Sequence, residues 1–424
     1  MSDVYIASGL RSPFSKVDGA LAAYDAVALS VPVAQAMVAR LKSKMRPDFM
    51  VWGSVVPNLG WSNIAREIWL DAELDPTVPA YSLVLMCASS VTAAVAAGGM
   101  LDDGIRDLAI VGGVESMSRV QIGLNQKLSD WLRHFLQARS LGARLETFSE
   151  LHWNNIRLHI PAIVNRTTGK SMGEHTEETA KEWHISRESQ DEWALKGHQR
   201  VIAARARGFF DDLIVAVGAA DHDTIPRNDT SMEKLARLPP AFDRISDRGT
   251  LTAGNSSPLT DGAASVWVAT KAGLSRLPDD TPFARLVDFE IASVDLRNEG
   301  LLMAPSYAIP RLFQRHNLRY DDIDLWEVHE AFAAQVLANV AALKDKDWIK
   351  RKTGLTRDFG AFPWERVNPN GSSIAIGHPF AATGARDLSQ CVKELFAMNA
   401  GSRAVVSVCA DGGQGVVVLL ERPK

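Results

Sequence analysis

The sequence predicts an α/β protein with a largely buried sheet, and two observations lead to that fold class. Apolar, strand-like segments alternate with segments of helical periodicity before residue 119 and again after residue 247, which is typical of sheets covered by helices. The two regions also echo each other weakly, because in each a reactive residue precedes a helix that leads into a strand ending in glycines. Duplication of one α/β unit would explain this echo.

In the first region, uninterrupted apolar runs predict strands, and apolar residues at helical spacing predict helices. Strands are expected within 3–9, 48–56 and 106–118, helices within 25–45 and 62–74, and a strand followed by a small-residue helix within 81–101. The alternation resumes after the segment 242–270. It continues through 323–344, 368–402 and 403–421.

Residues 119–247 have a different character and read as an insertion. The stretch 128–161 is amphipathic and carries aromatic and basic residues. We expect a helical excursion that packs on the core, with contact with a membrane surface or a partner subunit as the alternative. Residues 173–208 predict two solvated helices that divide near "HISRES". The expected organisation is 1–118 and 248–275 for the first half, 119–247 for the inserted loop domain and 276–424 for the second half.

The composition is that of an ordinary globular protein, with 424 residues, 46% apolar residues, 23% charged residues and a net charge of −4. The slightly acidic balance gives no general reason to bind nucleic acid. No secretory signal is apparent at the N-terminus and no run of 18 apolar residues occurs, so we expect a cytoplasmic location. The three cysteines are widely separated, which predicts neither a disulfide framework nor a CxxC metal site.

Cys87 lies where the apolar run "YSLVLM" changes to the small residues "ASSVTAAVAAGGML". If the second segment is helical, the unpaired N–H groups and positive dipole at its start would stabilise a thiolate, which is the nucleophilic form. The alternative is that Cys87 fills a core, because free cysteines are among the most buried residue types. Cys391 has helical spacing within "LSQCVKELF", and we expect it to be a core residue.

Two further segments carry candidate chemistry. His378 in "GHPFAATG" precedes a helix in a glycine- and alanine-rich turn, where it could accept a proton from a thiol, or simply bond its own backbone. Cys409 in "VCADGGQG" ends an apolar strand before a glycine turn. That turn could direct N–H groups at an oxyanion, and the thiol could exchange a proton during carbon–carbon chemistry; a buried strand-end cysteine is the alternative.

The segment "VHEAFAAQ" adds His329, which could donate to a carbonyl oxygen, and Glu330, which could orient a neighbouring group or a water. The HExxH spacing of zinc proteases is absent, since position 333 is alanine. The chain also lacks the phosphate-binding GxxxxGK[ST] pattern, which argues against a nucleoside triphosphatase.

These blocks together resemble the thiolase family over essentially the whole length. They are, in order, "CASS", "GGVESMS", "SMGEHTEETA…ISRESQDEWA", "GTLTAGNSSPLTDGAA", "HEAFAAQ", "NPNGSSIAIGHPFAATGAR" and "CADGGQG". Many thiolases carry Asn where this chain has His in "HEAFA". That difference, with "SGLRSPF", "SNIAREI" and "HPFAATGAR", is similar to the β-subunit type of the fatty-acid oxidation complex.

The resemblance implies two βαβαβαββ halves in a layered α-β-α-β-α arrangement, with a loop domain inserted in the first half. It implies a dimer or dimer of dimers and, for the β-subunit type, a hydratase/dehydrogenase α-subunit as a partner. Coenzyme A would be a co-substrate, with no permanently bound cofactor and no metal.

The resemblance also implies a two-stage acyl transfer. Cys87, activated by His378, would attack the ketone carbon of a 3-oxoacyl-CoA, and Cys409 would protonate the departing acetyl-CoA enolate. His329 and His378 would form one oxyanion hole, and the N–H groups of Cys87 and Asp411 the other. Glu330 would orient the site. Positions that line the pantetheine channel match Ser257, Met172 and Phe332.

Several residues depart from the common thiolase pattern. Ser90, Ser372 and Ala381 stand where glycine is frequent, and Asp411 replaces a common glycine or alanine. The N–H role survives at Asp411, but its carboxylate is expected to raise the pKa of Cys409 or to repel an enolate.

We interpret the chain as a 3-oxoacyl-CoA thiolase of β-oxidation. The alternatives are acetoacetyl-CoA formation by the same chemistry in reverse, or a non-catalytic acyl-CoA-binding descendant. A ketoacyl synthase would not be expected to carry the second cysteine before the C-terminal glycine turn.

Overall fold

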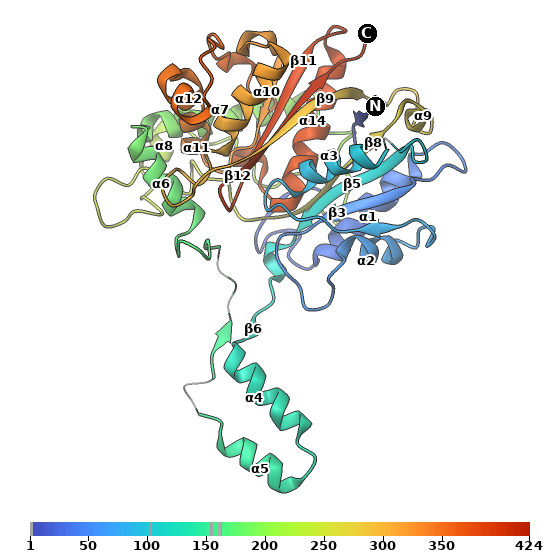
Figure 1. The fold of residues 1–424 in the computed structure, drawn as a ribbon, viewed down its shortest axis with the longest axis vertical. Helices are drawn as coiled ribbons and strands as arrows, with labels where there is room; N and C mark the ends of the chain where they lie inside the picture. Colours follow the sequence, from blue (N-terminus) through green and yellow to red (C-terminus); the bar gives the residue numbers. More distant parts are fainter. Residues whose placement is uncertain (1–2, 102, 153–155, 160, 162) are drawn as a thin grey trace.

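The computed structural model describes residues 3–101, 103–152, 156–159, 161 and 163–424. Trp153, within the amphipathic stretch 128–161, lies outside the described residues. In the described chain, a large mixed sheet is covered by helices, and a helical hairpin extends away from the body (Figure 1).

The strands of the main sheet follow the order β10-β11-β12-β9-β1-β8-β5-β3-β4, and β2 pairs with β8. Their bounds are β1 Tyr5–Ala7, β2 Ser15–Lys16, β3 Phe49–Gly53, β4 Ala80–Tyr81, β5 Leu108–Glu115, β8 Thr260–Ala269, β9 Phe283–Ser293, β10 Leu325–Val328, β11 Arg403–Ala410 and β12 Gln414–Glu421. A separate ribbon pairs β6 Gly123–Leu124 with β7 Leu158–His159. Strand β1 pairs antiparallel with both β8 and β9 and so joins the two halves.

The main helices are α1 Ala26–Ala39, α2 Ile64–Asp71, α3 Ser89–Leu101, α4 Gln126–Gln137, α5 Leu141–Ser149, α6 Met172–Glu182, α7 Arg187–Ala206, α10 Ala304–His316, α11 Ala333–Lys344, α12 Lys346–Thr353 and α14 Thr383–Ala397. Shorter ones include α8 Met232–Ala236, α9 Lys271–Leu274, α13 Ser373–Ile376 and the 3₁₀ turn η5 Phe380–Ala382. None of the described helices is both long and apolar enough to cross a membrane.

The expected duplication is confirmed by the topology. In the first half β3 and β5 are parallel and β5 is antiparallel to β8. In the second half β10 and β11 are parallel and β11 is antiparallel to β12. Helix α3 precedes β5 just as α14 precedes β11, so the two helices occupy equivalent places.

Helices α3 and α14 pack against each other at the centre of the molecule. Their small and aliphatic residues share one apolar core with strands from both halves, and Cys391 is part of that core, as expected. Helices α1 and α2 cover the opposite face of the first half, and α10, α11 and α12 cover that of the second. The chain is therefore layered, with the α3–α14 pair between two covered sheet halves. Elements that precede α3 and α14 are brought together at one end of this pair.

Helices α4 and α5, which make up most of the amphipathic stretch that the structure describes, do not pack on the core, so that expectation is wrong for them. Helices α4 and α5 form a hairpin arm that extends from the body (Figure 1), and neither helix has a fully buried residue. The two helices contact each other instead, through Trp131, which stacks on Phe135 and donates from Nε1 to the carbonyl of Thr147 (2.7 Å).

Helices α6 and α7 divide where expected, but they are not solvated on all sides. Helix α7 buries several residues, including Trp193, Ala194 and Val201, and α6 buries Glu177 and Ala180. Their charged residues partly mask this inner face in the sequence. Both helices pack on the second half near α11 and α13.

Candidate active site

Cys87 lies two residues before α3, in a tight turn rather than inside the helix. Met86 adopts a left-handed conformation (φ 47°), and the N–H groups of Ala88 and Ser89 donate back to the carbonyls of Leu85 and Met86. A non-glycine residue with positive φ is uncommon and is often held in place at functional sites. The turn leaves Cys87 partly exposed at the start of α3.

His378 lies at the matching place before α14. Gly377 is in a conformation that favours glycine (φ 119°), and an added Cβ there would meet the side chain of Ile225 at 2.7 Å. The backbone N–H of His378 donates to Thr260 Oγ1 (3.0 Å). Its ring Nε2 lies 3.2 Å from Cys87 Sγ and its Nδ1 lies 2.7 Å from Thr383 Oγ1. The nucleophile candidate and the base candidate are therefore in direct contact.

His329 follows β10 and lies beside His378, with the two ring centroids 4.2 Å apart. Its Nδ1 is 2.8 Å from Ser373 Oγ, whereas its Nε2 has no hydrogen-bond partner among the described residues. The sulfur of Cys87 and one ring nitrogen from each of His329 and His378 all lie within 4.8 Å of one another. A fully buried N with no protein partner is left for a bound substrate.

These groups are held in their neutral forms. Burial, together with the charge of Arg386, lowers the pKa of His378 to about 3. Burial, His378 and Arg386 hold the pKa of His329 well below its usual range. Burial, with the Asp411 carboxylate, raises the pKa of the Cys87 thiol to about 12, although the backbone N–H groups of Asp411 and Cys87 act to lower it.

The backbone N–H of Cys87 at the start of α3 favours the thiolate, as expected, but burial and the Asp411 carboxylate outweigh it in the free protein. The cost of placing a charge in this buried site exceeds the effect of the nearby N–H groups. With its pKa raised to about 12, Cys87 is a thiol at neutral pH, and it could act as a nucleophile only by losing that proton.

Cys409 lies at the end of β11 and is buried. It belongs to an apolar cluster that includes Phe332 and, at its edge, Met172. Burial, followed by the nearby Cys87, raises the pKa of Cys409 well above its usual value. This thiol is suited to hold a proton until a strong base, such as an enolate, reaches it.

Asp411 acts on a different thiol from the one expected. Its carboxylate raises the pKa of Cys87, whereas the raised pKa of Cys409 is caused first by burial and then by Cys87. Asn165 Nδ2, from the inserted segment, donates to Asp411 Oδ1 (2.8 Å) and fixes its orientation. Asn165 was not recognised in the sequence, because a loop asparagine far along the chain has no distinguishing pattern.

Glu330 is buried behind the histidines and accepts three hydrogen bonds. Trp193 Nε1 and Asn368 Nδ2 donate to Oε1 (3.0 and 2.7 Å), and the backbone N–H of Ile374 donates to Oε2 (3.3 Å). Burial raises its pKa. It therefore ties α7 to the segments on either side of the site.

The three candidate channel residues have different surroundings. Met172 begins α6 and borders the cluster that contains Phe332 and Cys409. Ser257 donates through both its N–H (3.0 Å) and its Oγ (2.9 Å) to the carbonyl of Ala331. These contacts place Ser257 beside the "HEAFA" segment, and its hydroxyl oxygen keeps the capacity to accept a hydrogen bond.

Two of the departures from glycine, Ser90 and Ser372, are accommodated by side-chain hydrogen bonds. Ser90 Oγ accepts from the N–H of Ala385 (2.8 Å) where α3 meets α14. Gly384 is required at this crossing, because a Cβ there would lie 2.7 Å from the backbone N of Val91. Ser372 Oγ donates to the carbonyl of Val328 (3.0 Å).

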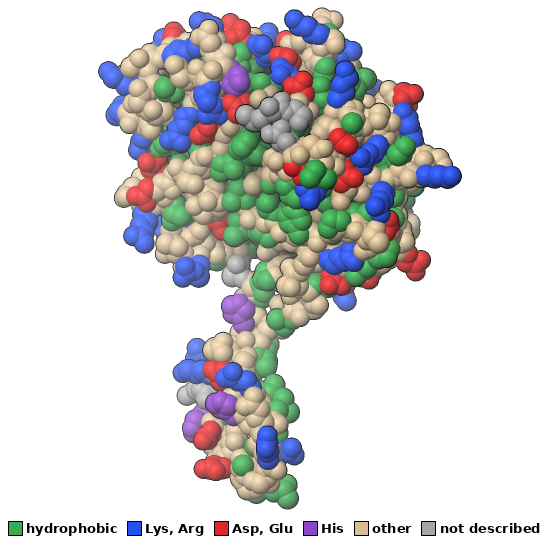
Figure 2. All heavy atoms as spheres, turned by 45° about the vertical axis from the view of Figure 1, so that its right-hand side comes forward, with side chains coloured by type: hydrophobic (Ala, Val, Ile, Leu, Met, Phe, Trp, Pro, Cys, Tyr) green, Lys and Arg blue, Asp and Glu red, His purple; other side chains and the backbone are tan. Residues whose placement is uncertain are grey.

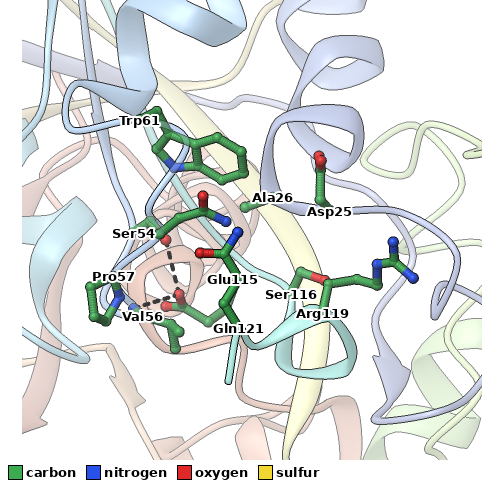
Figure 3. Close-up of a pocket in the computed structure, with 11 residues that line it drawn as sticks. Asp25, Ala26, Ser54, Val56, Pro57, Trp61, Glu115, Ser116, Arg119 and Gln121 are labelled. Carbon is green, nitrogen blue, oxygen red and sulfur yellow. Dashed lines mark hydrogen bonds between the residues drawn. The ribbon is translucent and has the colours of Figure 1, made fainter. Parts of the chain in front are cut away.

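Glu115 is a buried carboxylate that the sequence analysis did not single out. It accepts from Ser54 Oγ and the N–H of Val56 (both 2.9 Å), as Figure 3 shows, and from the N–H of Ala381 (3.4 Å) just after His378. Burial raises its pKa to about 7. It borders a small pocket with Trp61 and joins β5 to the turn that carries His378.

The comparisons with known proteins agree with this geometry. The thiolase N-terminal domain model matches residues 4–272 and the thiolase C-terminal domain model matches residues 280–422. The 3-ketoacyl-CoA thiolases of Shewanella baltica (strain OS185) and Erwinia tasmaniensis are 34% and 37% identical, over 99% of this chain and 96% of theirs.

Solved structures give the same result. Acetyl-CoA acetyltransferase from Bacillus anthracis has a TM-score of 0.79 and 30% identity, covering 99% of both chains. Acat5 thiolase from Ascaris suum in complex with coenzyme A has a TM-score of 0.79 and 25% identity, covering 99% of this chain and all of that one. This chain belongs to the thiolase family and is an acyltransferase.

Proposed function

We propose that the chain is a 3-oxoacyl-CoA thiolase of fatty-acid β-oxidation. It would use coenzyme A as co-substrate to convert a 3-oxoacyl-CoA into acetyl-CoA and a shortened acyl-CoA. The observation that supports this best is the 3.2 Å contact between Cys87 Sγ and His378 Nε2, with His329 and a buried second thiol, Cys409, close by. The required groups belong to the chain itself, and none of them calls for a permanently bound cofactor.

In the first stage, His378 takes the proton of Cys87 as the sulfur attacks the 3-oxo carbon. The oxyanion is held by the N–H groups of Cys87 and Asp411. Collapse of this intermediate breaks the bond between C2 and C3 and leaves an acyl group on Cys87. The departing acetyl-CoA enolate has its thioester oxygen held by His329 and His378, and Cys409 protonates its carbon to give acetyl-CoA.

In the second stage, the thiol of a new coenzyme A gives up its proton to a site base and attacks the acyl group on Cys87. The same two N–H groups hold the second oxyanion, and its collapse releases the shortened acyl-CoA and the free thiol of Cys87. Met172, Phe332 and Ser257 line the route by which the pantetheine arm reaches this point. Glu330 keeps the segments around both histidines in place.

The same residues also serve the reverse reaction, the condensation of two acetyl-CoA molecules to acetoacetyl-CoA. The similarity to the Bacillus anthracis acetyl-CoA acetyltransferase supports this as the second candidate. The two directions share each intermediate, so metabolite concentrations and the acyl pocket decide between them.

The test is coenzyme A-dependent cleavage of short-, medium- and long-chain 3-oxoacyl-CoA substrates, with Cys87→Ala as the control. We expect cleavage by the wild-type protein and a loss of at least about 10³-fold in Cys87→Ala. Absence of cleavage at every chain length would favour a non-catalytic acyl-CoA-binding protein. Full activity in Cys87→Ala would show that another residue is the nucleophile.

We also propose that the protein works as a homodimer or dimer of dimers and that the α4–α5 arm is a contact surface. The arm shows apolar side chains gathered along one edge in Figure 2. The exposed large apolar residues of α4 and α5 are Leu132, Leu136, Leu141, Leu145 and Phe148. Exposed apolar groups on this scale are typical of interaction sites. A hydratase/dehydrogenase α-subunit and a lipid surface are the two candidate partners.

Replacing Leu136 and Leu145 together by Ser should weaken this contact without changing turnover, since the arm extends away from the site. Co-purification from a native lysate tests the α-subunit, and flotation with anionic phospholipid vesicles tests the membrane. Recovery of only the homo-oligomer, with no vesicle binding, would contradict the proposed role of the arm.

A further inference from the structure

Each of the two histidines of the site contacts a hydroxyl group, and the two hydroxyls differ in whether another side chain restricts their hydrogen bonding. The Nδ1 of His378 lies 2.7 Å from Thr383 Oγ1, and the Nδ1 of His329 lies 2.8 Å from Ser373 Oγ. Among the described residues, the Thr383 hydroxyl has only His378 as a side-chain partner, so it can rotate to donate or accept. Ser373 has a second partner, and that partner fixes its role.

The second partner of Ser373 is Arg386, whose Nη2 lies 2.8 Å from Ser373 Oγ. A guanidinium group only donates hydrogen bonds and does not lose its proton in proteins, so Ser373 must accept from it. The single hydrogen of the Ser373 hydroxyl then has His329 Nδ1 as its acceptor. The opposite arrangement, with Nδ1 protonated, would give the serine oxygen two donors and leave its own buried hydrogen without an acceptor, which folded proteins avoid.

Arg386 is itself held firmly. Its side chain is 1% exposed, and its Nη1 lies 2.6 Å from Asp387 Oδ1 and 3.3 Å from Glu327 Oε1. It also donates to Ser372 Oγ (3.2 and 3.3 Å). Because these partners keep the guanidinium in place, its donation to Ser373 is a fixed feature of the site.

We propose that Ser373, held by Arg386, is a positioning residue that keeps His329 in the tautomer with the proton on Nε2. This inference rests on the proposed function and deepens it. Nε2 is the atom without a protein partner, so this tautomer presents an N–H donor to the thioester oxygen of the enolate. The other tautomer would present a lone pair and repel that oxygen.

The contrast with His378 follows from their tasks. His378 must take a proton on Nε2 and return it, and its Nδ1 stays protonated in both states, so Thr383 Oγ1 acts as the acceptor throughout. His329 only has to donate, and its hydroxyl partner is fixed in one orientation. The two adjacent imidazoles are thus specialised by the hydroxyl behind each ring.

The direct test is NMR of the protein labelled with ¹⁵N-histidine, in which ring-nitrogen shifts distinguish the two neutral tautomers. A His329→Gln variant assigns the signals. We expect protonated Nε2 and unprotonated Nδ1 in the wild-type protein, and a mixture of tautomers in Ser373→Ala. Protonated Nδ1 in the wild-type protein would overturn the inference.

A kinetic test separates the two oxyanion holes. Cleavage of acetoacetyl-CoA needs His329, whereas exchange of labelled coenzyme A into acetyl-CoA needs only the acyl-Cys87 stage. Ser373→Ala should lower cleavage about 10- to 100-fold, as removing the partner that orients a functional histidine commonly does, and should lower exchange far less. The matched control is Ser372→Ala. The Ser372 hydroxyl is equally buried and also accepts a hydrogen bond from Arg386, but it does not contact His329.

A wild-type protein that catalyses neither reaction would contradict the proposed function itself. If the wild-type protein catalyses both, an equal loss of both in Ser373→Ala would overturn the positioning role. The positioning role would also be overturned if Ser372→Ala changed the ratio of cleavage to exchange as much as Ser373→Ala does. Recovery of that ratio in Ser373→Thr, which restores a hydroxyl, would support it.

Discussion

At the scale of single residues, the site keeps its thiol and its two imidazoles neutral until substrate arrives. The pKa of Cys87 is raised to about 12 and that of His378 is lowered to about 3. Transfer of a proton between them is therefore unfavourable in the empty site. In the proposed mechanism it becomes favourable as the sulfur bonds to carbon and the negative charge moves onto an oxygen held by N–H groups.

Asp411 allows a test of this electrostatic balance. Its carboxylate disfavours the nearby thiolate, so Asp411→Asn should lower the pKa of Cys87 while keeping an oxygen for Asn165. We expect alkylation of Cys87 by iodoacetamide at neutral pH to become about three- to tenfold faster. Asp130→Asn, on the arm, is the control. An unchanged alkylation rate would show that the carboxylate does not influence the nucleophile.

At this scale the sequence indicated which side chains lie together better than it indicated their electrostatics. Cys87, His378, His329 and Cys409 are distinguished by glycine-rich or small-residue surroundings, which are visible in one dimension. Their ionisation depends on burial and on Asp411, which is 324 positions from Cys87 along the chain but close to it in the fold. No local pattern contains that information.

At the scale of secondary-structure elements, α7 belongs to the site although its sequence resembles a solvated helix. Its residue Trp193 reaches Glu330, and the rest of its inner face consists largely of alanine, glycine and polar residues. For the α4–α5 arm, the difference between prediction and structure is the reverse. Its apolar residues suggested packing on the core, yet they remain exposed, because periodicity identifies an apolar face and not what covers it.

The α7 contact can be tested by Trp193→Phe, which keeps an aromatic ring but removes the donor to Glu330. Loss of a hydrogen bond to a buried carboxylate should lower the free energy of unfolding by about 1–3 kcal/mol. Trp326→Phe is the matched control, because Trp326 is buried in the same core and its Nε1 has no partner among the described residues. Urea denaturation of both variants checks the prediction, and equal losses would contradict it.

At the scale of the whole molecule, the buried titratable groups predict an opposed pH dependence of stability. The folded-state pKa of His378 is about 3, so it contributes stability above its ordinary value of 6.5 and loses it as the pH falls. The folded-state pKa of Glu115 is about 7, so its contribution is full below its ordinary value of 4.5 and declines as the pH rises towards 7.

The variants His378→Gln and Glu115→Gln should therefore respond to pH in opposite ways. Between pH 6.5 and 5, the stability advantage of the wild-type protein over His378→Gln should shrink by roughly 1–2 kcal/mol. Its advantage over Glu115→Gln should instead grow as the pH falls. Denaturant unfolding at a series of pH values measures both, and parallel curves for the two variants would refute the assignment.

The duplicated architecture was predictable from the sequence because strand and helix segments recur in the same order around Cys87 and His378. The place where the halves touch was not, because it depends on a close approach of backbones. Gly384 meets the backbone of Val91, and Ser90 caps α14 through Ala385. Such a contact becomes visible only when both helices are in place.

That crossing has a consequence for how damage to the enzyme would appear. The Cys87 thiol belongs to one repeat and the His378 imidazole to the other. The 3.2 Å distance between Sγ and Nε2 therefore depends on how closely the two repeats pack. A larger residue at Gly384 would have to shift the two repeats relative to each other, because its Cβ would lie 2.7 Å from the backbone N of Val91. Because a displacement of about 1 Å between reacting groups can cost about 100-fold in rate, we expect turnover to fall more steeply than stability in Gly384→Ala, so the enzymatic rate reports on the assembly of the two repeats.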